Sequence, residues 1–163
     1  SLESYEWKKL LKFNFRQRPT EKKKTKIATE ERMQIIIEQL DQFVTYGYEY
    51  IGNKERLIFT PITERCYLTM MTALFYNRGG MLQGPAGTGK TETIKDLSRQ
   101  LAKFLLVFNC SSKNNYNTMA TIFMGMLKTG AWICFDEFNR IEVEVLSVVR
   151  IQLSSIYDGL KSV

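Results

Sequence analysis

The chain has 163 residues, of which 44% are hydrophobic and 12% aromatic, a composition that suits one globular core. No apolar run approaches the roughly 18 residues that a membrane span needs, and the charged N-terminus lacks the apolar core of a signal peptide. Histidine is absent, so the commonest general base is excluded and proton chemistry would fall to a carboxylate.

The net charge of +6 comes from one end of the chain. Residues 1–26 contain nine Lys or Arg against three Glu, whereas the acidic and basic residues of the remainder cancel. A basic segment of this kind suits contact with nucleic acid or with an acidic protein surface. The favoured interpretation is a solvated loop, around residues 19–26, that joins two strands.

Three segments before residue 53 have strand character. Phe13 and Phe15 alternate with polar residues, as in a half-buried strand. Residues 33–40 fit a strand or a helix, and three consecutive isoleucines within them favour the strand. The tyrosines at positions 46, 48 and 50 also alternate like strand residues, and we expect them to pack rather than to stack on a base.

An amphipathic helix is predicted to follow and to end at Gly79. Its apolar stripe consists of Cys66, Tyr67, Met70, Met71, Leu74 and Phe75. The methionines would suit an adaptable binding surface, but core packing is the favoured interpretation.

Residues 84–91 form a complete phosphate-binding motif. They are Gly84, Pro85, Ala86, Gly87, Thr88, Gly89, Lys90 and Thr91. The glycines let the backbone turn tightly, so that successive N–H groups surround an anion. Lys90 brings a charge to the β- and γ-phosphates and is assigned to catalysis as well as binding, while the Thr91 hydroxyl suits Mg²⁺. We therefore expect the loop to bind a Mg²⁺-nucleotide.

The flanks of this motif match the strand, loop and helix order that it requires. Residues 81–83 are a short apolar run that predicts the end of a buried strand. After the loop, Ile94, Leu97 and Leu101 recur at helical spacing, and Asp96 is expected among the polar residues on the other faces.

Two further strands are predicted downstream, with a helix between them. Residues 105–108 form the first strand, a helical stripe from Tyr116 to Leu127 stops at Gly130, and residues 131–135 form the second. The second strand leads into Asp136 and Glu137, 46 residues after Lys90 (136 minus 90). In nucleotide hydrolysis the first carboxylate holds the metal through water, and the second orients and deprotonates the attacking water.

These elements predict an α/β fold with three parallel strands and a nucleotide at their carboxyl ends. A last helix, with Val145, Leu146, Val149, Leu153 and Ile156 on one face, should cover the sheet. The cysteines at positions 66, 110 and 134 lack metal-ligand spacing and are expected to be buried free thiols.

The motifs together resemble the first AAA+ module of a dynein heavy chain. The resemblance rests on residues 46–52 (YGYEYIG), 60–67 (TPITERCY), 84–97, 135–141 (FDEFNRI) and 143–149 (VEVLSVV). Residues 91–93 and 143–149 look more axonemal than cytoplasmic. The likeness implies residues 1–42 as the end of the linker and residues 43–163 as the N-terminal part of a P-loop AAA+ module. In such modules a parallel sheet lies between two helical layers, and here that sheet would be truncated.

The same resemblance implies further site residues and partners. Asn109 corresponds to the polar switch residue that holds or releases the catalytic glutamate, although a turn asparagine remains an alternative. Ile58, Thr60, Pro61 and Ile62 would form the adenine pocket. The implied partners are microtubules, dynein intermediate and light chains, and a neighbouring AAA+ module that supplies an arginine finger. The implied location is the cytoplasmic cytoskeleton and the axoneme of a cilium or flagellum, with no membrane.

Three classes of function remain open from the sequence. The leading one is a segment of an ATP-hydrolysing motor. The alternatives are a nucleotide-binding structural fragment without hydrolysis and a nucleic-acid-stimulated P-loop ATPase. Because the sensor strand, lid and arginine finger of the family lie beyond residue 163, the isolated chain is expected to aggregate and to show no turnover.

Overall fold

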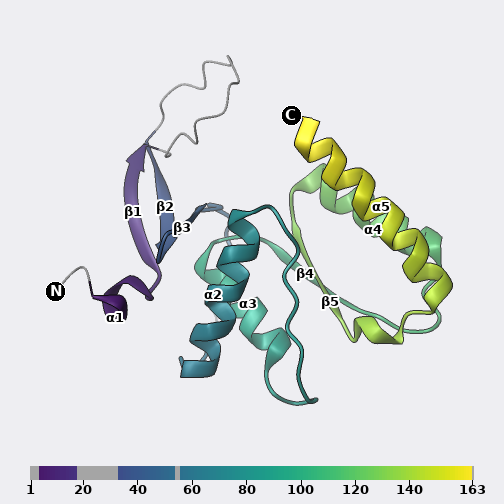
Figure 1. Ribbon diagram of the computed structural model, residues 1–163, viewed down its shortest axis with the longest axis horizontal. Coiled ribbons are helices and arrows are strands. Elements are labelled where there is room, and N and C mark those ends of the chain that lie inside the picture. The colour runs from purple at the N-terminus through teal and green to yellow at the C-terminus, as the bar shows by residue number, and fades with distance from the viewer. Residues whose placement is uncertain (1–3, 18–32, 54–55, 163) are drawn as a thin grey trace. The chain divides into compact units, whose positions relative to one another are not determined.

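The computed structural model describes residues 4–17, 33–53 and 56–162, and the chain forms two compact units. The first unit is Ser1–Lys103 and the second is Phe104–Val163. Figure 1 labels their α-helices and strands. The first unit contains α1 (Tyr5–Lys8), β1 (Lys12–Gln17), β2 (Met33–Gln39), β3 (Gln42–Thr45), α2 (Pro61–Phe75) and α3 (Lys90–Gln100). The second contains β4 (Leu105–Asn109), α4 (Tyr116–Thr129), β5 (Trp132–Asp136), the 3₁₀ turn η1 (Phe138–Arg140) and α5 (Val143–Ser162).

The first unit begins with an antiparallel sheet in the order β1-β2-β3. Phe13 pairs with Ile37 and Phe15 with Ile35, so the strands predicted around residues 13–15 and 33–40 are confirmed. Ile36 and Ile37 of the central strand are fully buried. The predicted basic loop at residues 19–26 lies outside the described residues, and the division predicted between residues 42 and 43 falls at the start of β3 and stays a prediction.

The strand expected at residues 46–50 does not form. The backbone N–H groups of Gly47 and Glu49 donate instead to the carbonyl oxygens of Leu101 and Ala102, at 2.8 and 3.0 Å. These carbonyls belong to the C-cap of α3 and to the residue after it, so the segment satisfies backbone acceptors where the helix ends. Gly47 is required there, because a Cβ would lie 2.1 Å from the Ala102 oxygen.

Helix α2 begins where its sequence provides a cap. The Thr60 side chain accepts a hydrogen bond from the Thr63 N–H at 3.3 Å, and Pro61 occupies the first helical position. Met70 and Met71 are buried, so they belong to the core, as favoured from the sequence. None of the helices within the described ranges combines the length and apolarity that crossing a membrane requires.

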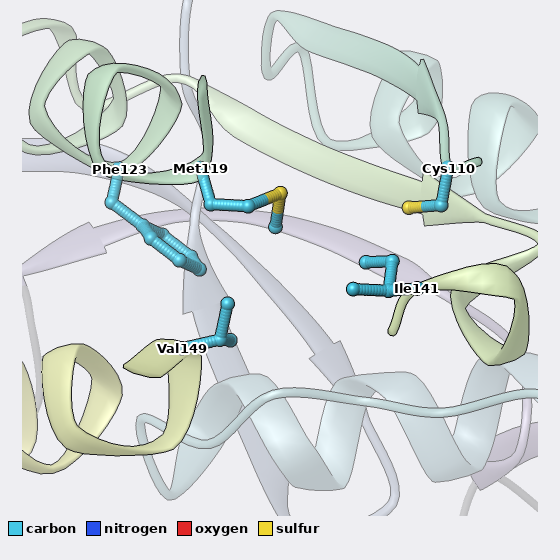
Figure 2. Packing of buried hydrophobic residues seen from close by; sticks show 5 residues of the cluster. All are labelled: Cys110, Met119, Phe123, Ile141 and Val149. Carbon is cyan, nitrogen blue, oxygen red and sulfur yellow. The ribbon is translucent and has the colours of Figure 1, made fainter. Parts of the chain in front are cut away.

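The second unit is a parallel two-stranded sheet with helices packed on it. β4 and β5 pair in register from Leu105 with Trp132 to Asn109 with Asp136. α4 and α5 lie side by side in Figure 1. Their buried residues meet in one cluster, drawn in Figure 2. That cluster contains Cys110, Met119, Phe123, Ile141 and Val149, with Phe108 and Phe135 of the strands packed against it. The last helix therefore covers the sheet, and the α/β class is confirmed.

Two sequence predictions need correction. Residues 81–83 are not a strand: they form no ladder with the described residues, and Met81 is largely exposed. A short apolar run becomes a strand only when a neighbour pairs with it, so the parallel sheet described here has two strands rather than three. Cys66, Cys110 and Cys134 are thiols outside any disulfide, as expected, but Cys66 is only half-buried.

Candidate functional site

The phosphate-binding motif forms a tight loop that ends at the N-terminus of α3. Gly87 and Gly89 have φ angles of +74° and +77°, in the left-handed region where a side chain is strained. The Thr88 hydroxyl donates to the Pro85 carbonyl oxygen at 2.9 Å and closes the loop on itself. Residues 84–89 are exposed, so a ligand can reach their backbone.

The Lys90 side chain folds back over this loop. Its ammonium group donates to the carbonyl oxygens of Gly84 and Pro85, at 2.9 and 2.6 Å. A third, longer contact of 3.5 Å reaches the Thr88 hydroxyl. The loop therefore carries a positive charge at its centre, where an anionic ligand would meet it.

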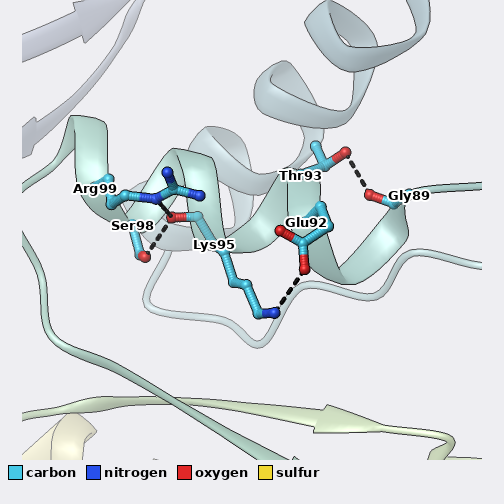
Figure 3. Close-up of polar contacts among 6 residues, drawn as sticks. All are labelled: Gly89, Glu92, Thr93, Lys95, Ser98 and Arg99. Carbon is cyan, nitrogen blue, oxygen red and sulfur yellow. Dashed lines mark hydrogen bonds and ion pairs between the residues drawn. The ribbon is translucent and has the colours of Figure 1, made fainter. Parts of the chain in front are cut away.

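The first turns of α3 support the loop. Thr93 bonds Gly89 twice, because its N–H and its hydroxyl both donate to the Gly89 carbonyl oxygen, at 2.9 and 2.8 Å. Figure 3 shows the hydroxyl contact, together with the ion pair of Glu92 and Lys95 at 2.6 Å. The Thr93 N–H donates the first intrahelical hydrogen bond of α3. The N–H groups before that point lie at the N-terminal end of the helix and are directed toward the loop that precedes it. With the helix dipole, this arrangement suits phosphate.

The predicted adenine-side residues lie just before and at the start of α2. Thr60 and Pro61 form its cap and first position. Ile58 and Ile62 are 83% and 74% exposed, unusual values for isoleucine. Their apolar surfaces are therefore available to a ligand.

The second unit carries the predicted acidic group at the carboxyl ends of its strands. Asn109 and Asp136 are the last residues of β4 and β5 and are directly paired in the ladder. The backbone N–H of the next residue, Cys110, donates to the Asp136 carbonyl oxygen at 2.9 Å. The structure thus brings together two residues that lie 27 positions apart in the sequence (136 minus 109).

Glu137 turns away from the strand direction immediately after Asp136. Its φ of +53° is rare for a residue with a side chain, and its N–H donates to Asp136 Oδ1 at 3.0 Å. Its carboxylate pairs with Arg140 at 3.3 Å on an exposed surface. Strained residues of this kind concentrate at functional sites.

The charge of Asp136 also acts on the buried thiol beside it. Burial is the main cause that raises the pKa of Cys110 to about 11, and the negative charge of Asp136 adds to it. Cys110 therefore stays a neutral core thiol and is not a nucleophile at neutral pH.

Two residues that the sequence analysis did not assign to a site are joined in the first unit. Asp96 was expected on a polar face, but it is only 4% exposed and accepts a hydrogen bond from the Tyr67 hydroxyl of α2. A signal lay in its spacing from Thr93, because residues three positions apart share a helix face and Thr93 is also buried.

The observed parts suit a nucleotide and a divalent cation. In the first unit, exposed backbone donors and an ammonium at a helix N-terminus fit phosphates, and the Thr91 hydroxyl is an oxygen ligand of the kind that Mg²⁺ prefers. In the second unit, Asp136 offers a carboxylate oxygen of the same kind. No three His, Cys, Asp or Glu side chains cluster as a metal site in the part of the chain that the structure describes.

A glycine loop that opens a helix, and a parallel strand that ends in two carboxylates, define a P-loop nucleotide-binding α/β protein. Residues 46–163 match the family described as the hydrolytic ATP binding site of the dynein motor region, and the chain belongs to that family.

Curated relatives point the same way. The chain is 54% identical over 134 residues to dynein axonemal heavy chain 3 of Homo sapiens, a match that covers 82% of this chain. It is 51% identical over 131 residues, or 80% of this chain, to the Dynein-1-beta heavy chain of the flagellar inner arm I1 complex of Chlamydomonas reinhardtii. Each match spans 3% of the relative's length, so the chain corresponds to one small segment of these heavy chains.

Proposed function

We propose that this chain binds Mg²⁺-ATP and hydrolyses it as a segment of an axonemal dynein heavy chain. The observation that carries the proposal is the phosphate loop, with two left-handed glycines and the Lys90 ammonium held at its centre. The resemblance of the chain to axonemal heavy chains supports the assignment to this class of motor.

Each site residue has a role that follows from its chemistry. Residues 84–89 and Lys90 would hold the phosphates, and Thr91 and Asp136 would hold Mg²⁺. When bound, Mg²⁺ neutralises charge on the phosphate oxygens. Glu137 would accept the proton of the attacking water, because no histidine is available for that role. Asn109, which pairs with Asp136 at the end of the β4–β5 ladder, would act as the switch residue that holds or releases Glu137.

The base would be held on the side of α2. Ile58, Thr60, Pro61 and Ile62 contribute an exposed apolar surface and backbone groups at a helix start. Such surfaces bind the face of an aromatic base by burying apolar area.

The relatives' names, which include axonemal heavy chains and a flagellar inner arm, support a proposal for the wider setting. The heavy chain would act on microtubules in the axoneme of a cilium or flagellum, together with dynein intermediate and light chains. A neighbouring AAA+ module would complete the site with an arginine finger, an element that increases phosphoryl-transfer rates by about 10³–10⁵.

The test compares two activators of ATP hydrolysis by the full-length natural polypeptide that carries these residues. Microtubules and single-stranded DNA are added separately at matched salt, since charge-driven binding depends on ionic strength. Stimulation by microtubules alone supports the motor assignment. Stimulation by DNA alone would instead support a nucleic-acid-dependent ATPase, and ATP binding without hydrolysis under either condition would support a structural nucleotide module.

A further inference from the structure

Asp96 is a buried carboxylate on the helix that carries the phosphate loop. It lies six residues after Lys90 in α3 (96 minus 90) and is 4% exposed. A carboxylate at such a position is costly unless hydrogen bonds replace the water that it loses. Its partners therefore indicate why it is there.

Both oxygens of this carboxylate meet donors from outside α3. The Tyr67 hydroxyl of α2 donates to Oδ2. The backbone N–H of Leu57 lies 3.5 Å from Oδ1, at the long end of the hydrogen-bond range. Burial first, and then the hydrogen bond to Asp96, raise the pKa of Tyr67 well above its ordinary value. Tyr67 thus remains protonated and keeps donating.

The segment that contains Leu57 is attached at a second point. The Phe59 ring meets the Tyr67 ring edge to face, with centroids 5.5 Å apart, a favourable aromatic geometry. Ile58, between these two anchored residues, is 83% exposed. The chain then enters the Thr60 cap of α2. Leu57 and Phe59 are anchored to the Asp96–Tyr67 pair, while Ile58 is held outward.

We propose that the Asp96–Tyr67 pair is a positioning unit that fixes the adenine-side segment relative to the phosphate-loop helix. It sets the affinity for the base without contributing to phosphate contacts. The unit joins the helix of Lys90 to the segment of Ile58 through one buried carboxylate, so both halves of the nucleotide site share one anchor. This inference rests on the proposed function, because it assigns the base to the α2 side.

The test separates base affinity from phosphate affinity in the full-length natural polypeptide. ATP hydrolysis gives KM and kcat, and inorganic tripolyphosphate serves as a competitive inhibitor that has no base. For Tyr67→Phe we expect KM for ATP to rise by roughly five- to tenfold, as lost positioning weakens base contacts. The kcat and the inhibition constant of tripolyphosphate should change less than about twofold.

Matched variants separate positioning from general stability. Tyr48→Phe removes a tyrosine hydroxyl that lies in the first compact unit but outside the Asp96–Tyr67 pair. This hydroxyl accepts a hydrogen bond from the Ile35 N–H at 2.8 Å, and its removal should leave the KM for ATP unchanged. Asp96→Asn keeps an acceptor for Tyr67 but turns an amide NH2 toward the Leu57 N–H, so its KM should rise less than that of Asp96→Ala, which should behave like Tyr67→Phe. Phe59→Leu, at a half-exposed site that tolerates change, should raise the ATP KM alone.

The outcomes are distinct. An unchanged ATP KM in Tyr67→Phe and Phe59→Leu, or equal weakening of ATP and tripolyphosphate, would overturn the positioning role and leave the proposed function standing. If the wild-type polypeptide shows no saturable ATP hydrolysis and no inhibition by tripolyphosphate, the proposed function fails and this inference fails with it.

Discussion

The phosphate loop of the first unit and the carboxylate edge of the second are built in different ways. The loop is formed by eight consecutive residues, and its contacts join neighbours, such as Lys90 to Gly84 and Pro85. The carboxylate edge exists because β4 and β5 align, which places Asn109 beside Asp136. That edge also depends on packing behind it, since Phe135 of β5 rests on the buried cluster of α4 and α5.

The difference has a physical consequence for mutation. A site made by adjacent residues fails when one of its own groups is changed, because its shape is encoded in local backbone angles. A site made by paired strands also fails when distant core residues are removed, because the register depends on tertiary packing. The four predictions below probe this contrast, from the largest effect to the smallest.

Removing the support behind the carboxylate edge should have the largest effect. Phe123 of α4 is buried, with its ring 5.6 Å from that of Phe135. Phe123→Ala should destabilise the second unit by about 3–5 kcal/mol, since a large buried aromatic leaves a cavity. Hydrogen exchange of the β5 amides in the full-length polypeptide measures this loss. Met124→Ala, at an exposed neighbouring position of the same helix, is the control and should leave the exchange unchanged. Equal protection in both variants would contradict the dependence on packing.

Changing Glu137, the proposed base, should separate chemistry from binding. Glu137→Gln keeps the shape of the side chain but cannot accept the proton, so turnover should fall by roughly 10² or more. ATP binding should persist. Single-turnover kinetics and nucleotide titration on the same preparation measure the two effects. The control is Glu144→Gln, at an exposed position in the first turn of α5. Normal turnover in Glu137→Gln would assign the base elsewhere.

Removing the charge from the phosphate loop should weaken binding itself. Lys90→Ala loses a charge-assisted contact worth about 1.5–3 kcal/mol, which corresponds to at least about tenfold in ATP affinity. Lys95→Ala is the matched control, because Lys95 lies on the same helix and pairs with Glu92 on the surface. A fluorescence titration with equal affinity for both variants would argue against the loop as the phosphate site.

Backbone strain in the loop should give the smallest effect. Gly89→Ala places a side chain at a φ of +77°, which costs about 1 kcal/mol and should weaken ATP binding by roughly fivefold. Gly125→Ala is the comparison, because its Cβ would meet nothing within 4 Å in the middle of α4. That change should leave ATP affinity unaltered and slightly stabilise the helix. Identical nucleotide affinities for the two variants would show that the loop does not need its left-handed glycine.

The sequence predictions succeeded where neighbouring residues decide the structure and failed where distant residues decide it. The helices after the loop and before Gly130 were predicted from their apolar stripes, and the strands that end at Asn109 and Asp136 were predicted from short continuous apolar runs. The failures occurred where a partner decided the structure. The alternating tyrosines predicted a strand, yet the backbone of Gly47 bonds the end of α3. Asp96 looked like a surface residue, yet the Tyr67 hydroxyl compensates its burial.

The sequence by itself determined the phosphate loop, the acidic residues at and just after the end of β5, and the helical caps at Thr60 and Gly130. These features depend on neighbouring residues and on backbone angles that few residue types adopt. Only the tertiary structure decided that Asn109 lies beside Asp136, that residues 81–83 form no strand, and that Asp96 anchors Tyr67 and Leu57. Strand register and the satisfaction of buried polar groups depend on atoms contributed by distant parts of the chain, and no local pattern records which groups will meet.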